Sequence, residues 1–390
     1  MRTMRRRAIG ASVFLALVVA LLVLLTPFLT GLAFVIRSAG IGGSVRRLAE
    51  LETGRVTEHM ESIPTGSAPL RARRYEPGTR GRREVLLVSG LHPAGIDEPR
   101  LVGLARQLAA SGLTVTTPDI PELSQFQITP AVTDAIERSA QWLLADTSIE
   151  TDRRIGMIGI SFSGGLSLVA AGRPSIRDRL AFVLSFGGYD DLPRVLRYLC
   201  TGREPARGPG APGLTRPPHD YGVAVVLLAI ADTMVPPDQV EPLRRGVRQF
   251  LLASALDAVD KSEALREFAA VRELARVLPE PSATLLRYVN NRDVARLGER
   301  LVDHLGTYGT DPALSLSQSP RPSAPVFLLH GTDDNVIPAA ESEFLAADLA
   351  GHAPVRLLLS PVILHADAGG PAHAADVWAL GSFWADVLRR

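Results

Sequence analysis

Ser161 lies at a position in the chain where a serine could act as a nucleophile. It directly follows an apolar run, residues 155–160, and the small residues Ser163, Gly164 and Gly165 come soon after it. A buried strand that turns sharply into a helix needs small residues, and the amides at the helix start can stabilise negative charge. A serine hydroxyl is a weak nucleophile, so it needs a base and an acid that orients the base.

Carboxylate and imidazole side chains follow two later apolar runs, residues 325–329 and 355–359. The first run is followed by Asp333 and Asp334, and the second by His365 and then His373. Lone histidines are common surface or core residues, so it is their place after strands that makes these two candidates for a base.

The elements that would position these residues alternate between short apolar runs and helical stretches. This alternation predicts a mostly parallel sheet flanked by helices, the α/β class. The predicted strands are residues 70–75, 84–88, 114–117, 155–160, 181–185, 325–329 and 355–359. The predicted helices between them are residues 98–110, 130–145, 164–171, 339–349 and 374–388.

The long interval between the predicted strands at residues 181–185 and 325–329 contains no clear strand. A structureless loop of that length would be unusual in a compact domain. We therefore predict a helical insertion at about residues 192–322 that forms a cap, within a domain covering 70–390. Its predicted helices are residues 223–230, 238–256, 263–277, 282–289 and 293–305.

The stretch Gly159-Ile-Ser161-Phe-Ser163-Gly164 resembles the nucleophile elbow, G-x-S-x-G, of the α/β-hydrolase family. The resemblance covers residues 70–390 without the insertion and implies that Ser161 is the nucleophile. The chain departs from the family pattern because Ser163 stands where the motif has its second glycine. Ser163, with Gly165 two residues later, is therefore the alternative nucleophile.

The family resemblance also implies which acid completes the site. The segment His330-Gly-Thr-Asp-Asp334 resembles the family's acid strand and loop, which implies Asp334 as the acid and Asp333 as the alternative. Some relatives carry the acid after the preceding strand, where this chain has Asp190 and Asp191. His330, at the end of the strand itself, is interpreted as structural.

The base and the oxyanion hole are implied in the same way. A histidine after the last strand is the family's base, which implies His365, with His373 as the alternative. The amides of Phe162 and Leu91 would bind the oxyanion, and His92 could instead touch the substrate. These roles describe a serine hydrolase (carboxylesterase- or lipase-like) that cleaves an ester through an acyl-enzyme, with activity falling below about pH 6–7.

The substrate of such a site is not specified by the motif. The many apolar residues of the cap favour an apolar acyl group. Two alternatives stay open: a non-catalytic, membrane-bound binding protein of the same fold, and an acyltransferase that passes the acyl group to an alcohol. No cofactor and no metal are expected.

The first 36 residues predict a single transmembrane helix. Residues 8–36 carry no charge, which exceeds the ~20 residues that span a bilayer. Arginines flank this run on both sides, with a slight bias that places the catalytic domain outside the cytoplasm. A cleaved signal peptide, and hence secretion, is the alternative. Residues 37–69 are predicted to be a stalk, with a short helix near residues 44–53.

Composition excludes several other classes. The formal net charge is +1, so no overall field favours nucleic acid. Cys200 is the only cysteine, which excludes an internal disulfide and a cysteine-rich metal site. The sequence does not indicate an oligomeric state.

Overall fold

The computed structural model describes residues 25–390, except 52, 66–67, 79–80, 82, 146–153, 207–212 and 364–372. An eight-stranded sheet forms its centre, in the order β1-β2-β4-β3-β5-β6-β7-β8. The strands from β3 to β8 pair in parallel, while β2 pairs antiparallel with both β1 and β4. The strands are β1 Val56–Ile63, β2 Leu70–Pro77, β3 Glu84–Val88, β4 Thr114–Pro118, β5 Ile155–Ile160, β6 Leu180–Phe186, β7 Val326–Gly331 and β8 Val355–Ser360.

All seven predicted strands are confirmed, but strand β1 was missed. The sequence placed residues 37–69 in a stalk, whereas Val56–Ile63 pairs with β2 from Val56 opposite Pro77 to Ile63 opposite Leu70. Six of its eight residues are charged, polar or methionine, and most are exposed; β1 is one of the two edge strands of the sheet. An exposed edge strand has no apolar run, so the signal that identified the other strands was absent here.

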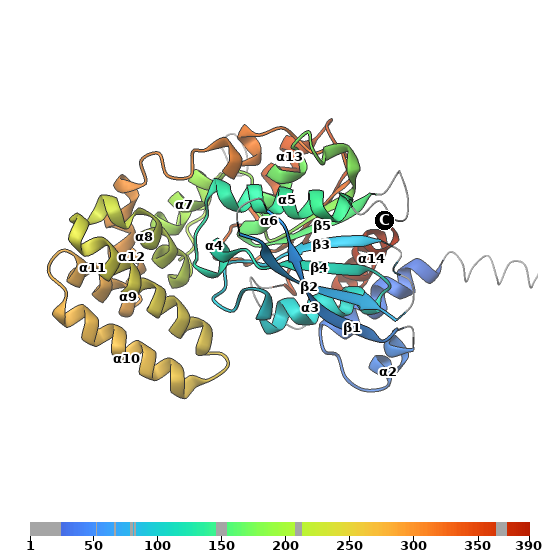
Figure 1. Ribbon diagram of the computed structural model, residues 1–390, viewed down its shortest axis with the longest axis horizontal. Helices are drawn as coiled ribbons and strands as arrows, with labels where there is room; N and C mark the ends of the chain where they lie inside the picture. The colour runs from blue at the N-terminus through green and yellow to red at the C-terminus, as the bar shows by residue number, and fades with distance from the viewer. Residues whose placement is uncertain are drawn as a thin grey trace, which may run out of the picture.

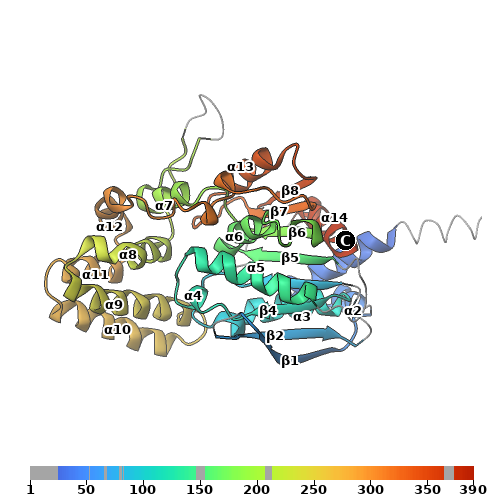
Figure 2. The same ribbon diagram turned by 45° about the horizontal axis from the view of Figure 1, so that its top comes forward.

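Helices cover both faces of the sheet (Figures 1 and 2). Helices α5, Pro130–Ala145, and α6, Phe162–Ala171, pack on one face together with α13, Ala340–Leu349. Helices α3, Pro99–Ala110, and α14, Ala374–Arg389, pack on the other. Successive residues of β3 alternate between the two cores: Leu86 and Val88 in the first, Val85 and Leu87 in the second. This burial on both sides explains why the central strands read as continuous apolar runs.

The inserted segment is helical, as predicted, and lies at one end of the molecule (Figure 1). Its helices are α7 Leu192–Thr201, α8 Asp220–Met234, α9 Pro237–Leu256, α10 Lys261–Val277, α11 Ser282–Asn290 and α12 Val294–Leu301. Their buried side chains belong to the same hydrophobic cluster as the α5 and α6 face of the sheet. The insertion is therefore packed into the domain core. Short elements complete the chain: α2 Ser44–Glu50, α4 Pro121–Ser124 and the 3-10 turns η1 Gly95–Asp97, η2 Arg177–Arg179, η3 Val302–His304, η4 Pro312–Leu314 and η5 Leu316–Gln318.

The end of the predicted transmembrane run packs on the domain. Residues 25–38 are helical, and Phe34 and Val35 are buried in the core on the α14 side. Gly31 crosses α14 so closely that a Cβ on it would lie 2.1 Å from the Gly381 carbonyl oxygen. Residues 1–24, most of the predicted span, lie outside the described residues. Within the described part of the chain, no helix is long and apolar enough to cross a bilayer.

Candidate active site

Ser161 occupies a strained turn between strand β5 and helix α6. Its backbone has φ 58° and ψ −129°, a conformation that side-chain-bearing residues rarely adopt. The turn is held in place because the Ser161 amide donates to the Phe186 carbonyl at 2.7 Å, at the end of β6. The chain reverses so tightly that a Cβ at Gly159 would lie 2.3 Å from the Ser163 carbonyl oxygen. This geometry raises the Ser161 side chain at the carboxyl edge of the sheet, where ligands bind in α/β folds.

Ser163 is in a different environment. Its side chain is fully buried, and its hydroxyl lies 3.1 Å from the Val88 carbonyl oxygen and 2.8 Å from that of Ile160. The same hydroxyl oxygen accepts the Ile160 amide at 2.9 Å. Ser163 thus ties the ends of β3 and β5 together.

The loop after β3 runs directly past Ser161. A Cβ at Gly90 would lie 3.5 Å from the Ser161 Cβ, so the predicted oxyanion loop adjoins the predicted nucleophile. Phe162 is the first residue of α6, and Leu91 is buried beside the turn. Backbone amides at a helix start and in a neighbouring loop can stabilise a negative charge between them.

His92, in the same loop, is partly buried. Its Nδ1 accepts the Ala94 amide at 3.2 Å. Burial, and to a smaller extent the Arg100 charge, lower the pKa of His92, while the Glu98 charge opposes this. A neutral imidazole is therefore favoured next to the predicted oxyanion loop.

Asp334 is buried in the loop after β7. Its Oδ1 accepts the amides of Val336 and Ile337 at 2.8 and 3.0 Å. Its Oδ2 faces Gly187, in the loop after β6, where a Cβ would lie 3.6 Å from that oxygen. Because Gly187 follows the residue whose carbonyl binds the Ser161 amide, both predicted residues adjoin the loop after β6, the strand that lies between β5 and β7.

The two neighbours of Asp334 that the sequence also singled out play other parts. Asp333 points to solvent and pairs with Arg216 at 3.2 Å. His330 is fully buried: its Nδ1 lies 2.7 Å from the Ser342 hydroxyl and its Nε2 lies 2.9 Å from the Ile337 carbonyl oxygen. His330 Nε2 is also 3.4 Å from Asp334 Oδ2. These contacts agree with a structural role for His330.

The earlier carboxylates, Asp190 and Asp191, lie in a cluster at the start of the insertion. Asp191 caps helix α7 by accepting the Arg194 amide at 2.9 Å. Asp190 pairs with Arg194 at 3.1 Å, and Arg194 also binds the fully buried Glu341 at 2.6 Å. Burial raises the pKa of Asp190 to about 6 despite the pairing with Arg194, and the Glu341 charge raises it further.

Of the two histidines predicted as the base, the structure describes only His373. His365 falls in residues 364–372, outside the described residues. His373 begins α14 as its N-cap, and its own amide donates to the Asp376 carboxylate at 3.3 Å. His373 thus has a capping contact at the start of that helix.

The insertion contacts both predicted site loops, through residues that sequence reasoning did not single out. The partly buried Tyr221, at the start of α8, donates its hydroxyl to the Leu91 carbonyl at 3.2 Å. The His219 amide and the Tyr198 hydroxyl both bind the Asn335 carbonyl, at 2.9 and 3.3 Å. These contacts span more than 100 residues of sequence, so no local pattern could have shown them.

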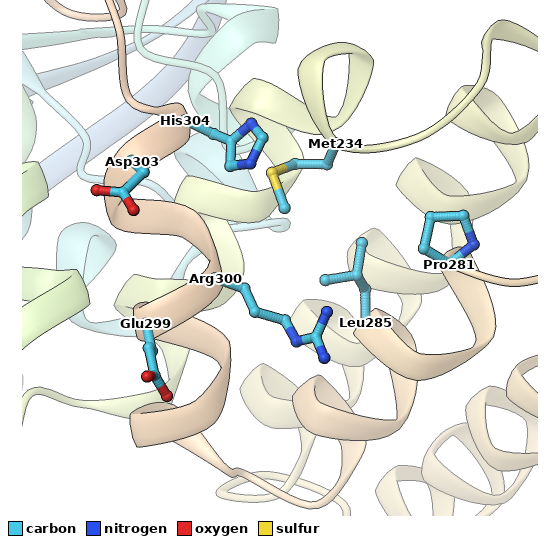
Figure 3. Close-up of a pocket in the computed structure, with 7 residues that line it drawn as sticks. All are labelled: Met234, Pro281, Leu285, Glu299, Arg300, Asp303 and His304. Carbon is cyan, nitrogen blue, oxygen red and sulfur yellow. The ribbon is translucent and has the colours of Figure 1, made fainter.

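A separate pocket of about 340 Å³ lies within the insertion (Figure 3). None of the predicted site residues lines it. Its walls are Met234, Pro281, Leu285, Glu299, Arg300, Asp303 and His304. In the described part of the chain, no group of three or more His, Cys, Asp or Glu side chains is arranged to hold a metal ion.

Comparisons with known proteins find similarity in structure alone. No family model and no curated protein sequence matches the chain. An esterase of Pyrobaculum calidifontis is similar at 16% identity, covering 93% of this chain and 91% of its own, with a TM-score of 0.43. A protein described as a dienelactone hydrolase from Klebsiella pneumoniae is similar at 14% identity (86% and 98% covered, TM-score 0.42). An acylaminoacyl peptidase of Pyrococcus horikoshii is similar at 10% identity (90% and 44% covered, TM-score 0.48).

The chain combines a mostly parallel eight-stranded sheet, helices on both faces of the sheet, and a strained serine turn between β5 and α6. With these features, the chain has an α/β-hydrolase-like fold.

Proposed function

We propose that the protein is a serine hydrolase that cleaves a carboxylic ester, with Ser161 as its nucleophile. The observation that carries the proposal is the Ser161 backbone at φ 58°. Strain of about 1–3 kcal/mol at a side-chain-bearing residue persists where the surrounding structure enforces it, and such residues cluster at functional sites. Here the Phe186 carbonyl holds the Ser161 amide, and the missing side chain at Gly159 leaves room for the tight reversal of the chain.

The proposed acid is Asp334. An acid that orients a histidine must be held rigidly. The two amide bonds to Oδ1 hold Asp334, and Oδ2 is directed towards the loop that adjoins Ser161. Asp333, in contrast, is exposed beside Arg216. The proposed base is His365, on the grounds of its position after the last strand.

The proposed reaction has two steps. His365 takes the Ser161 proton while the Ser161 oxygen forms a bond to the ester carbonyl carbon. The amides of Phe162 and Leu91 stabilise the oxyanion, which collapses to an acyl-enzyme as the alcohol leaves with the proton from His365. Water, deprotonated by His365, then attacks the acyl group and releases the acid and the free serine.

The test is covalent labelling by a fluorophosphonate probe, which reacts with activated serines. The full chain and its variants Ser161→Ala and Ser163→Ala are compared. We expect Ser161→Ala to lose labelling and to lose ester hydrolysis by about 10⁴-fold or more. Ser163→Ala should keep labelling, with reduced stability because it removes hydrogen bonds between β3 and β5.

Ser163→Ala is the matched control, since it removes one hydroxyl two residues away. Labelling that survives in Ser161→Ala but disappears in a folded Ser163→Ala would move the nucleophile to Ser163. Unlabelled parent protein that shows its full circular dichroism spectrum would favour the non-catalytic interpretation. Competition with added alcohol separates hydrolysis from acyl transfer.

A further inference from the structure

Exposed apolar side chains concentrate near the N-terminal end of the described chain. Of the thirteen large hydrophobic side chains that are exposed in the described residues, six lie between residues 25 and 51. A seventh, Trp378 on α14, stacks on Phe28 with ring centroids 4.0 Å apart. We call these seven the N-terminal surface: Leu25, Leu29, Ile41, Val45, Leu48, Leu51 and Trp378.

Helix α2 gives this surface its form. Its inner side is fixed because Ala49 is buried against Ala33 and Ile36, and the Ala49 carbonyl accepts the Arg37 guanidinium at 2.8 Å. Leu48 in α2 and Leu51, which follows the helix, face outwards and are 65% and 78% exposed. These outward side chains contribute little to the packing of the domain.

Positive charge accompanies the exposed apolar residues. Arg46 and Arg47 lie in α2 itself, and Glu50, which pairs with Arg46 at 2.7 Å, is the helix's one acidic residue. A short element with apolar side chains and arginines has the composition of a segment that lies in a membrane interface, where tryptophan is also enriched. Basic residues there attract anionic head groups.

The chain itself indicates where a bilayer would be. Residues 8–24 are uncharged and apolar in sequence, and they lead directly into residue 25 of this surface. The helical segment 25–38 and α2 lie together at the end of the molecule opposite the inserted helices (Figures 1 and 2). We propose that this end rests on an anionic phospholipid bilayer, with α2 and Trp378 in the head-group layer and the insertion directed away. This inference does not depend on the proposed enzymatic activity.

The test places fluorescent labels on the full chain in phosphatidylcholine vesicles with or without phosphatidylglycerol. Leu48→Cys carries a polarity-sensitive label, and Val259→Cys, an exposed site in the insertion, is the matched control. The native Cys200 should stay unlabelled because it is buried, which raises its pKa to about 12. We expect lipids with a nitroxide near the head group to quench the Leu48 label, and aqueous iodide to quench the Val259 label.

Further readings decide the outcome without relying on one variant. The same lipids should quench the tryptophan fluorescence of the unsubstituted chain, and Trp378→Phe should remove that quenching. Arg46→Gln combined with Arg47→Gln should remove the additional shielding that phosphatidylglycerol provides. A Leu48 label as open to iodide as the Val259 label overturns the proposal. So does efficient energy transfer between Leu48 labels at low protein-to-lipid ratio, which would assign the surface to a second copy.

Discussion

In two pairs of nearly adjacent, identical residues, the two side chains lie in different environments. Ser161 and Ser163 differ by two positions, yet one is raised on a strained turn and the other is buried in hydrogen bonds between strands. Asp333 and Asp334 are neighbours, yet one faces solvent and the other binds two backbone amides. In both pairs the surrounding backbone gives the two members different environments.

The aspartate pair gives a prediction at the scale of the residue. Asp334→Asn keeps an oxygen that can accept the Val336 and Ile337 amides but loses the charge that stabilises a protonated histidine. We expect the turnover of an activated ester to fall by about 10³–10⁴-fold. Asp333→Asn loses only an exposed ion pair worth about 0–1 kcal/mol and should keep near-parental turnover. Equal losses in the two variants, measured by steady-state hydrolysis, would contradict the assignment of the acid.

At the scale of the element, the crossing of the N-terminal helical segment with α14 depends on glycine. Phe34 stacks on Trp384 with centroids 4.3 Å apart, and Gly31 lies against the backbone of Gly381 and Ala385. Backbone atoms cannot move aside as a flexible side chain can. The close approach therefore fixes a segment that hydropathy alone would assign wholly to a membrane.

Gly31→Ala should loosen this crossing. The added Cβ would lie 2.1 Å from the Gly381 oxygen, so the helix must shift, and we expect the free energy of unfolding to fall by about 1–3 kcal/mol. Gly42→Ala is the control, because a Cβ there has no neighbour within 4 Å. Urea unfolding followed by tryptophan fluorescence compares the two. A loss no greater than that of Gly42→Ala would show that the crossing does not stabilise the domain.

At the scale of the whole molecule, the insertion and the sheet share one hydrophobic cluster and a polar junction. The junction is formed by Asp190, Arg194 and Glu341, which connect the end of β6 and the start of α7 to α13. A shared core favours a single cooperative unfolding transition. The junction should make the stability of that transition depend on pH.

The raised pKa of Asp190 determines how the free energy of unfolding changes with pH. The folded protein binds this proton up to about pH 6, whereas the unfolded chain releases it near 3.8. The folded state thus holds more protons between these values, so this contribution to stability is present below about pH 4 and is lost as the pH rises through 6. Asp190→Asn should lower the free energy of unfolding less at pH 7 than at pH 4, by roughly 1–3 kcal/mol.

Urea unfolding at the two pH values measures this difference. Asp232→Asn, which removes an exposed carboxylate of the insertion, is the matched control for the loss of one negative charge. If Asp190→Asn and Asp232→Asn respond alike to pH, the buried junction is not the source of the dependence.

The sequence by itself determined the sheet from β2 to β8 and most of the helices. Strands buried on both faces leave continuous apolar runs, and turns such as Gly159–Gly165 need small residues. Both features can therefore be recognised within a short stretch of sequence. The same local signals identified Ser161 and the two aspartates after β7. Edge strand β1 left no such signal, because an exposed strand needs no apolar run.

The tertiary structure alone decided which members of each candidate pair face the sheet edge. It also decided that Gly31 and Phe34 pack on α14, and that Tyr221 and His219 join the insertion to the loops around Ser161 and Asp334. These features depend on contacts between residues far apart in the chain. Such contacts form only when the sheet brings its strand ends together, so no sequence window contains them.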